Sequence, residues 1–281
     1  MKDVSVIIVN YNTKGLVSDC LDSVFSKTQG LDFEAIVVDN ASTDGSRDLF
    51  QSDGRINYVY NDTNLGFGRA NNRGLELASG RNVLFLNSDT LIRGNAIKTL
   101  SDYLDSHPEA GACGANLFTR DGRPNQSYMP FMPGIRAELM RFFEMKPEVF
   151  NSSGRAKQVG FISGADLMVR KAVLDEVGAF DERFFLFFEE TELCARISAA
   201  GYRIVSVPEA EIVHFGGASV KSEEKEQIYR ASRKLYLSLT HSAFAAKVAD
   251  AIWAATVYSR ILLTSGCREK REKWLKRREM L

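Results

Sequence analysis

Short runs of β-branched and aliphatic residues alternate with amphipathic helical patterns along the first third of the chain, and this alternation constrains the fold more than any other feature. The apolar runs at residues 4–9, 34–38, 56–60 and 82–86 are typical of strands. Strands that alternate with helices imply a mainly parallel sheet joined by right-handed crossovers. The sequence therefore predicts an α/β fold with a central sheet flanked by helices.

All four expected strands end in polar residues. In chain order these are Asn10, Tyr11 and Asn12; Asp39 and Asn40; Asn61 and Asp62; and Asn87, Ser88 and Asp89. In such sheets, ligands bind in the crevice outside the carboxyl ends of the strands. Any one of these clusters is equally well explained as an ordinary polar loop. Their joint placement favours a binding crevice.

The second half of the chain has a less regular pattern. Residues 118–157 show poor periodicity and four prolines, which indicates a long excursion of the kind that forms lids or binds substrate. A strand interrupted at residues 163–165, two helices and a strand stopped by Pro208 are expected next. From residue 222 to about residue 264 the pattern is helical and increasingly apolar.

Three single residues have both a functional and an ordinary interpretation. Asp39 either caps a turn, which spacing slightly favours, or accepts hydrogen bonds from a nucleobase or ribose. Asp89 follows the apolar strand of LFLNSDT, where it either holds a divalent cation that bridges phosphates or is a solvent-facing turn residue. His214 precedes the glycines of HFGG, which allow a ligand to approach closely, but a lone histidine is more often a packing residue.

The run from Asn64 to Gly74 is rich in glycine but lacks the order of a dinucleotide fingerprint. Its glycines permit close backbone approach, or they only shape the entrance of a helix. Arg69 and Arg73 lie four residues apart on one expected helix face and suit a phosphate or a base.

The segment FDERFFLFFEETELC, residues 180–194, combines five acids with five consecutive large apolar residues. An apolar block of this length must be buried, so the acids are expected at the edge of an apolar cavity. Glu189, Glu190 and Glu192 also suit the positive end of a helix that starts near Glu189. One of them is a candidate general base.

Composition excludes several classes of protein. Lysine plus arginine equals aspartate plus glutamate at 36 each, so no overall basic field predicts nucleic-acid binding. The four cysteines form no CxxC pair, which disfavours a zinc site or a disulfide framework and fits a reducing cytoplasm. No signal peptide and no membrane-spanning segment is expected.

Seven motifs in order resemble glycosyltransferase family 2, the inverting, nucleotide-sugar-dependent enzymes of the GT-A fold. They are SVIIVNYN, VVDNASTDGS, NLGFGRANNRG, LNSDT, SGADLMVRK, FDERFFLFFEETELCARI and HFGGAS. The combination of LNSDT with FDERFFLFFEETELC is most similar to the rhamnosyltransferase-like branch that builds bacterial surface polysaccharides. The resemblance covers roughly residues 3–220.

The resemblance implies a role for each matching residue. The nucleotide sugar would be bound by Val9, Asn10, Tyr11, Asn12, Asp39, Gly66, Phe67, Gly68, Asn71, Asn87, Ser88, Gly164 and Ala165. Asp89 would match the last acid of the family's DxD motif and, with His214, hold Mn²⁺ or Mg²⁺ at the diphosphate. Asn87 stands where the motif has its first acid, so a neutral amide is expected to weaken metal affinity or change metal preference.

The same resemblance makes Glu190 the general base and Glu189 its neighbour, although aspartate is usual at the position of Glu190. An acceptor hydroxyl deprotonated by Glu190 would attack the anomeric carbon in line, while the cation stabilises the leaving nucleoside diphosphate. The acceptor would be a glycan or a lipid-linked molecule. A sugar-phosphate nucleotidyltransferase and a non-catalytic sugar-nucleotide-binding protein are the alternatives.

We expect a GT-A domain at residues 1–220, with a nucleotide-binding half at 1–117 and an acceptor-binding, catalytic half at 118–220. Residues 221–281 form a C-terminal helical extension. Its stretch 243–263 is either an amphipathic helix on the inner membrane surface or a helix packed on the domain or in a homodimer interface. The tail from Cys267 carries seven basic and three acidic residues, which favours peripheral membrane contact by a cytoplasmic protein.

Overall fold

The computed structural model describes residues 2–216 and 222–264, together with residues 271, 274, 275 and 278. Its strands are β1 (Val4–Asn10), β2 (Phe33–Asp39), β3 (Ile56–Tyr60), β4 (Asn82–Asn87), β5 (Thr90–Arg93), β6 (Ala110–Phe118), β7 (Tyr128–Met129), β8 (Lys157–Gln158), β9 (Phe161–Ile162), β10 (Asp166–Arg170) and β11 (Arg203–His214). Its helices are α1 (Lys14–Lys27), α2 (Ser46–Phe50), α3 (Phe67–Leu75), α4 (Ala96–Ser106), α5 (Ile135–Phe142), α6 (Lys171–Val177), α7 (Glu189–Ala199), α8 (Ser222–Thr240) and α9 (Ala243–Leu263).

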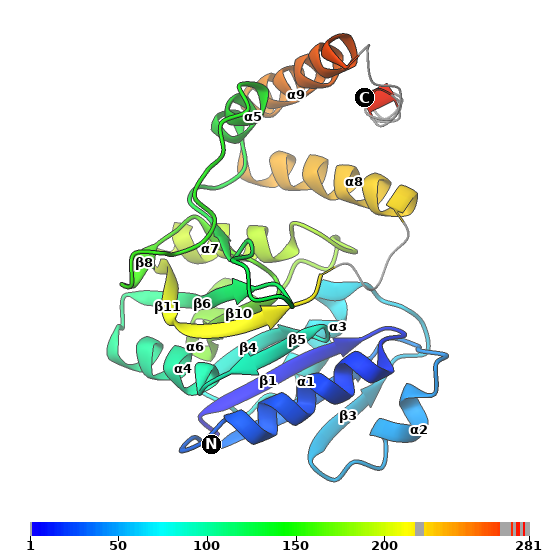
Figure 1. Cartoon of the computed structure of the whole chain (residues 1–281), viewed down its shortest axis with the longest axis vertical. Helices are drawn as coiled ribbons and strands as arrows, with labels where there is room; N and C mark the ends of the chain where they lie inside the picture. The colour runs from blue at the N-terminus through cyan, green and yellow to red at the C-terminus, as the bar shows by residue number, and fades with distance from the viewer. Residues whose placement is uncertain (1, 217–221, 265–270, 272–273, 276–277, 279–281) are drawn as a thin grey trace.

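A central sheet with the strand order β3-β2-β1-β4-β10-β6-β11-β5 forms the core of the molecule (Figure 1). The first four strands in this order are parallel, as the alternating pattern predicts. The other half is mixed, because β10 is antiparallel to both β4 and β6, and β5 is antiparallel to β11. The parallel half brings the polar ends of β1, β2 and β4 to one edge.

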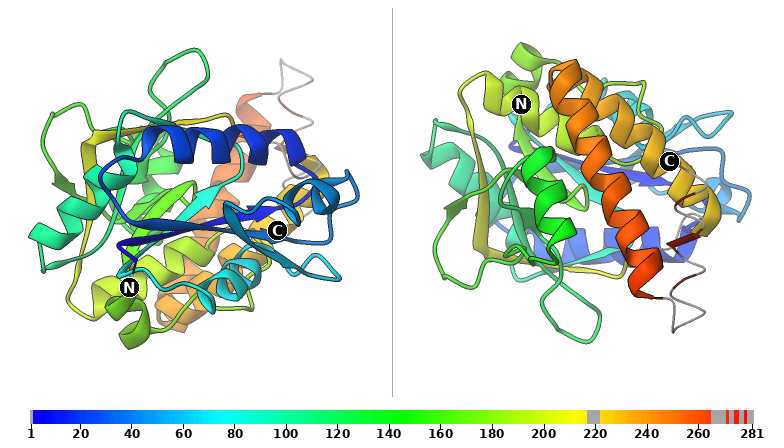
Figure 2. Two further views of the ribbon diagram at one scale, coloured as in Figure 1. Left: turned by 90° about the horizontal axis from the view of Figure 1, so that it is seen from below. Right: turned by 90° about the horizontal axis from the view of Figure 1, so that it is seen from above.

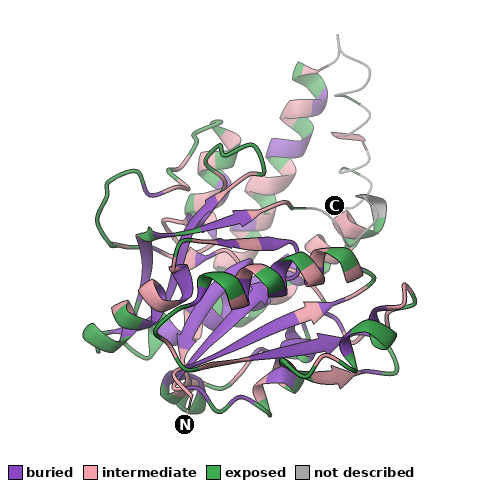
Figure 3. Cartoon of the chain, turned by 60° about the horizontal axis from the view of Figure 1, so that its bottom comes forward, coloured by how far each residue is buried: buried purple, intermediate pink, exposed green. Residues whose placement is uncertain are grey.

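Helices cover both faces of the sheet. Along β1, Val6 and Ile8 point to the face covered by α1, α2 and α4, whereas Ile7 points to the face covered by α3, α6 and α7. The sheet is therefore buried on both sides (Figure 3). This explains why β1, β2 and β4 are mainly continuous apolar runs rather than alternating ones.

The sequence patterns miss one region and misplace one strand end. No element was expected over β5, α4 and β6, and the alanine- and glycine-rich sequence of β6 lacks the β-branched residues typical of strands. The strand expected to stop at Pro208 instead continues to His214, so that prediction is wrong. The pairing of β11 with β6 shifts register between Val207 and Glu211, and this irregularity accommodates a proline that cannot donate to a ladder.

The C-terminal helices pack on the domain and on each other. The helical stretch breaks at Ser242, whose Oγ accepts a hydrogen bond from the backbone nitrogen of Ala245 and so caps α9. Viewed from above, α5, α9 and α8 lie side by side (Figure 2). None of the helices within the described ranges is long and apolar enough to cross a membrane. The basic tail lies mostly outside these ranges.

A buried charge cluster joins these three helices. Arg233 of α8 lies 3.0 Å from Glu138 of α5 and 2.6 Å from Asp250 of α9. Phe188 packs nearby against Tyr236 of α8. The C-terminal region is thus tied to the excursion that precedes β8 and to the start of α7.

Cys20, Cys113 and Cys194 are buried and unpaired, and Cys267 lies outside the described residues.

Candidate active site

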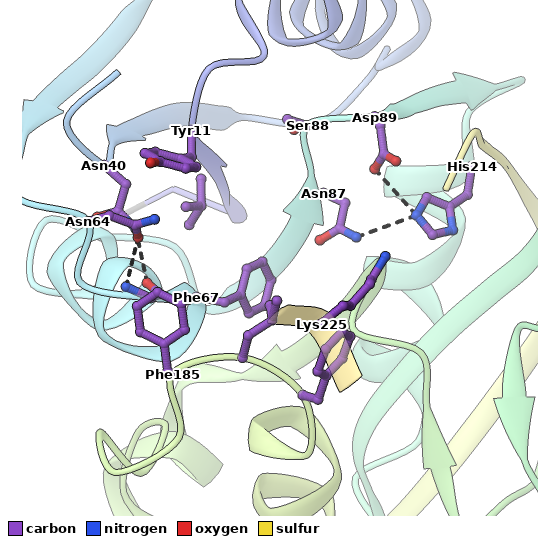
Figure 4. A pocket seen from close by; sticks show the side chains of 14 residues that line it. Tyr11, Asn40, Asn64, Phe67, Asn87, Ser88, Asp89, Phe185, His214 and Lys225 are labelled. Carbon is purple, nitrogen blue, oxygen red and sulfur yellow. Dashed lines mark hydrogen bonds and ion pairs between the residues drawn. The ribbon is translucent and has the colours of Figure 1, made fainter. Parts of the chain in front are cut away.

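A cavity of about 300 Å³ lies at the carboxyl ends of β1, β2 and β4 (Figure 4). Its lining residues come from seven regions of the chain: Val9, Tyr11, Asn40, Asn64, Gly66, Phe67, Asn87, Ser88, Asp89, Phe185, Leu186, Phe187, His214 and Lys225. Aromatic and amide side chains line one end, and the charged side chains line the other. We call it the donor cavity.

The sheet register assembles the charged end. Thr90 of β5 pairs with His214 of β11, so the end of one strand meets the start of the other. The backbone nitrogen of Phe215 donates to the carbonyl of Asp89 at 3.0 Å, and His214 Nε2 lies 3.3 Å from Asp89 Oδ1. The same ring nitrogen lies 3.5 Å from Asn87 Nδ2. Residues far apart in sequence therefore form one polar cluster.

Asp89 is held in its ionised form. Burial raises the pKa of this carboxyl, but its interactions with His214 and with backbone hydrogen-bond donors together outweigh burial, and the net pKa lies below the ordinary value. A carboxylate, an imidazole and an amide are all acceptable donors to a divalent cation, which often binds one or two carboxylates plus phosphates and water. Asp89, His214 and the neighbouring Asn87 fit that pattern, although the described residues contain no cluster of three or more acids, histidines or cysteines.

Asn40 organises the opposite end. Its Nδ2 donates to Asn64 Oδ1 at 3.0 Å and to the carbonyl of Gly66 at 3.1 Å. Its Oδ1 accepts from Asn61 Nδ2 at 3.0 Å and from the backbone nitrogen of Leu65 at 3.2 Å. The loop before α3 is therefore fixed to the end of β2, beside the ring of Tyr11 (Figure 4).

Gly66 allows the loop before α3 to touch the segment before α7. Its φ is 84°, and an added Cβ would lie 2.4 Å from the carbonyl oxygen of Phe185. The next backbone nitrogen, that of Phe67, donates to this same carbonyl at 2.8 Å. Only glycine fits both the conformation and the contact. This contact closes one wall of the donor cavity.

A second cavity of about 500 Å³ lies on the other side of Phe187, which lines both. It is built from the excursion, the start of α7 and the inner face of α8. Its lining includes Glu190, the aromatic rings of Phe131, Phe161 and Tyr229, and the guanidinium of Arg141. We call it the acceptor-side cavity.

Glu190 and Glu189 differ in surroundings despite being adjacent. Glu190 lines the acceptor-side cavity, accepts a hydrogen bond from Thr191 Oγ1 at 3.1 Å and lies against Gly164. Glu189 is buried near Gly68 of α3, and its Oε2 has no hydrogen-bond partner in the described part of the chain. Burial raises the pKa of both carboxyls, and the charge of Glu190 raises that of Glu189 further. A raised pKa suits a general base that works near neutral pH.

Phe187 and Phe188 are held in the left-handed region, with φ of 69° and 67°. This conformation is unfavourable for bulky side chains and is tolerated where the surroundings enforce it. Phe188 is packed against Tyr229 and Tyr236 of α8. The strained pair directs Glu190 into one cavity and Phe187 between the two.

The structure brings only part of the expected site together. Val9, Tyr11, Gly66, Phe67, Asn87, Ser88, Asp89 and His214 line the donor cavity. Most of the other expected donor-binding residues lie around it: Asn10 and Asp39 are buried beneath it, Asn12 accepts from the backbone of Thr43, Gly68 and Asn71 are buried in α3, and Ala165 is buried beside Asn87. Gly164 does not line the donor cavity and lies beside Glu190.

Asp39 supports the cavity from below. Its Oδ1 accepts from the backbone nitrogen of Ser42 at 2.8 Å, and its Oδ2 accepts from Asn10 Nδ2 and the Tyr58 hydroxyl. This is the turn-stabilising interpretation that spacing favoured.

Three other charged residues singled out in the sequence lie outside the donor cavity. Arg69 and Arg73 do not line the cavity, and they form exposed ion pairs with Glu182 and Glu76. Glu192 lies in the first turn of α7, as expected for an acid at a helix start. It also holds Arg196 at 2.8 Å, and that arginine donates to the carbonyls of residues 177–179.

Six lining residues of the donor cavity were given no individual site role from the sequence: Asn40, Asn64, Phe185, Leu186, Phe187 and Lys225. Asn40 could have been found, since it belongs to a polar strand end. The apolar run at residues 184–188 predicted that these side chains are buried, but not that three of them line this cavity. Lys225 gave no signal, because it lies in a helical stretch that the pattern separates from the sheet.

The fold is the GT-A fold of glycosyltransferases. The crystal structure of S. aureus TarS 1-349 in complex with UDP-GlcNAc matches with a TM-score of 0.58 at 20% identity, over 91% of this chain and 71% of TarS 1-349.

The chain belongs to glycosyl transferase family 2, whose model matches residues 5–178. It is 30% identical over 234 residues to the N-acetylglucosaminyl-diphospho-decaprenol L-rhamnosyltransferase of Mycobacterium tuberculosis, over 74% of this chain and 76% of the relative. It is 27% identical over 227 residues to the dTDP-rhamnosyl transferase RfbF of Shigella flexneri, and the match covers 78% of this chain and 71% of that relative. The resemblance drawn from the motifs is confirmed.

Proposed function

We propose that this chain is an inverting glycosyltransferase that moves a sugar from a nucleoside-diphosphate sugar to a hydroxyl of a glycan or lipid-linked acceptor in bacterial surface polysaccharide synthesis. The observation that carries the proposal is the pair of adjoining cavities. One contains Asp89 and His214, the other contains Glu190, and Phe187 lines both. Transfer between two substrates needs such an arrangement. Family membership and the rhamnosyltransferase relatives support it.

In this proposal the nucleoside occupies the amide and aromatic end of the donor cavity. Tyr11 offers a ring face to the base, and Asn40 and Asn64 hold the loop that encloses it. The diphosphate lies at the charged end, near Asp89 and His214. The volume of about 300 Å³ is at the lower limit of small-molecule sites, so the fit to the nucleotide is close.

Glu190 removes the proton from the acceptor hydroxyl. The hydroxyl oxygen forms a bond to the anomeric carbon as the bond from that carbon to the diphosphate oxygen breaks. The nucleoside diphosphate leaves with the electron pair, and the anomeric configuration inverts. Because Glu190 opens into the acceptor-side cavity, the acceptor approaches from that side. Gly164 lies beside the Glu190 side chain, since an added Cβ would make an ordinary contact with its Cγ at 3.5 Å.

Asp89 and His214 would hold Mn²⁺ or Mg²⁺, with Asn87 able to bind a water of the ion. When bound, the cation neutralises charge on the leaving diphosphate. The ionised state of Asp89 supports this role, because a cation site needs a carboxylate at neutral pH.

The acceptor is proposed to be presented at the inner face of the cytoplasmic membrane. Exposed apolar side chains at the ends of α5 and α9 support this placement: Phe143, Met145, Leu262 and Leu263. Arg260 of α9 donates to the carbonyl of Phe142, so these two ends are adjacent. The M. tuberculosis relative is named for a diphospho-decaprenol acceptor. Helix α9 packs on α5, and the exposed apolar residues at their ends could alternatively form a homodimer interface.

A two-part assay tests the proposal. Thermal-shift measurements with a panel of nucleotide sugars and Mn²⁺ would identify the donor, and nucleoside diphosphate release would then be followed with and without a lipid-linked acceptor. Acceptor-dependent release supports the proposal. Pyrophosphate release from a sugar phosphate and a nucleoside triphosphate would indicate a nucleotidyltransferase. Binding without turnover over all donors and acceptors would indicate a binding protein.

A further inference from the structure

Lys225 is a charged side chain in the donor cavity that the family motifs do not include. It lies in the first turn of α8, and it lines the cavity together with Asn87, Asp89 and His214. Figure 4 shows its ammonium directed toward the Asn87 and His214 side chains. In the described part of the chain, no carboxylate forms an ion pair with Lys225.

The charged residues that line the cavity provide little positive charge for a diphosphate apart from the ammonium of Lys225. Asp89 is the cavity's one lining carboxylate among the described residues, and His214 already contacts it. Asn87 is neutral, so this position adds no negative charge with which to hold a cation. A diphosphate carries at least two negative charges, and desolvating them in a cavity is unfavourable without nearby positive charge.

We propose that Lys225 binds the diphosphate of the donor and of the leaving nucleoside diphosphate. Asn87 replaces an acid that would help to hold a metal ion, and the positive charge of Lys225 neutralises part of the diphosphate charge in its place. The inference rests on the proposed function. In this role Lys225 transfers no proton. It stabilises the negative charge that builds up on the diphosphate as the bond to the sugar breaks.

The position of Lys225 also gives the C-terminal helical region a function in donor binding. The same helix contributes Tyr229, Arg233 and Leu237 to the acceptor-side cavity. Helix α8 therefore contacts both cavities, with Lys225 at its start and Leu237 toward its end. A diphosphate bound to Lys225 would link the sheet to α8, and would favour the arrangement in which the acceptor-side cavity is complete.

Calorimetry in EDTA tests the role of Lys225 without metal or turnover. UDP and dTDP are titrated into the full chain and into Lys225→Met, Lys225→Arg and Lys234→Met, the last being an exposed lysine on the same helix. We expect Lys225→Met to bind the preferred diphosphate about 10- to 100-fold more weakly, as loss of one charge-assisted hydrogen bond predicts. Lys225→Arg should retain most of the affinity, and Lys234→Met all of it.

Saturation-transfer NMR with the matching nucleoside, uridine or thymidine, separates this inference from the proposed function. We expect the nucleoside to bind the parent chain and Lys225→Met equally, because it has no phosphate. Equal diphosphate affinity of the parent chain and Lys225→Met, with nucleoside binding intact, would overturn the role of Lys225 alone. Failure of the parent chain to bind any nucleoside or diphosphate would overturn the proposed function itself.

Discussion

His214 Nε2 lies 3.3 Å from Asp89 Oδ1, and the antiparallel pairing of β5 with β11 sets this distance. The contact joins the turn after β4 to the end of the last strand of the sheet. Both side chains are largely buried yet line the donor cavity. The pair is therefore built into the sheet rather than placed on a mobile loop, and it defines where a diphosphate and its cation would bind.

Asp89→Asn should remove the gain in donor affinity that Mn²⁺ provides, because an amide adds no negative charge to a site whose Asn87 is already neutral. Affinity for the nucleoside alone should not change. Calorimetry with the preferred nucleoside diphosphate, with and without Mn²⁺, measures the gain. Asp62→Asn is the matched control, since Asp62 is exposed just after the end of β3 and does not line the donor cavity. A Mn²⁺ gain of parent size in Asp89→Asn would remove Asp89 from the metal site.

Gly66→Ala should damage both stability and donor binding, because its Cβ would lie 2.4 Å from the carbonyl oxygen of Phe185. Gly122→Ala is the control: its φ of 80° is similar to the 84° of Gly66, but nothing lies within 4 Å of an added Cβ. The control should cost about 1 kcal/mol from backbone conformation alone. Thermal unfolding and nucleotide titration should show a larger loss, with weakened binding, for Gly66→Ala only. Equal losses would mean that the contact with Phe185 is unimportant.

Asp166 should make stability fall as pH rises. The side chain is fully buried, Oδ1 has no hydrogen-bond partner among the described residues, and burial raises its pKa from 3.8 to about 7. The folded state thus holds a proton that the unfolded state releases above pH 4. Stability is greatest below that pH and decreases toward pH 7, by up to about 4 kcal/mol for this group.

Asp166→Asn should remove this dependence, because its amide can occupy the place of the protonated carboxyl. Urea unfolding at pH 5 and pH 8 measures the effect. We expect the variant to gain stability relative to the parent chain as pH rises. If the unfolding free energies of variant and parent differ by the same amount at pH 5 and at pH 8, Asp166 is ionised in the folded protein and the prediction is wrong.

Glu138→Ala should destabilise the packing of α5 on α8 by about 3 kcal/mol, because it removes a partner of the buried guanidinium of Arg233. The remaining ion pair with Asp250 would balance the charge of Arg233 but would leave some of its N–H donors without a partner. Glu148→Ala is the control, since its pair with Lys157 is exposed to solvent and should contribute less than about 1 kcal/mol. Denaturant unfolding compares the two. Similar small losses would mean that the charge cluster does not hold the C-terminal helices.

The sequence predicts the half of the fold whose signals are local. The strands β1, β2 and β4 are mainly continuous apolar runs, and their polar ends correctly indicate a crevice at the edge of the sheet. The strand β6 could not be predicted, because alanine and glycine form a strand there only by being buried between β10 and β11. The path of β11 past Pro208 likewise depends on its neighbour β6, since the register shift that admits the proline exists only in the sheet.

The site divides in the same way. Asp89, His214 and Glu190 could be identified because each stands in an ordered motif. The placement of Glu190 and Asp89 in two different cavities could not be predicted, because it depends on the left-handed conformation of Phe187 and Phe188. The entry of Lys225 into the donor cavity depends on how α8 packs on α7, which no local pattern encodes.

The most direct test of the account is sugar transfer by Glu190→Gln under saturating donor and acceptor. We expect the rate to fall by about 10²- to 10⁴-fold, as loss of a general base predicts, with nucleoside diphosphate affinity unchanged. In the parent chain the rate should rise with pH through a pKa above the ordinary glutamate value, since burial raises that of Glu190. Undiminished transfer by Glu190→Gln would contradict the account and would assign the base to Glu189 or Glu192.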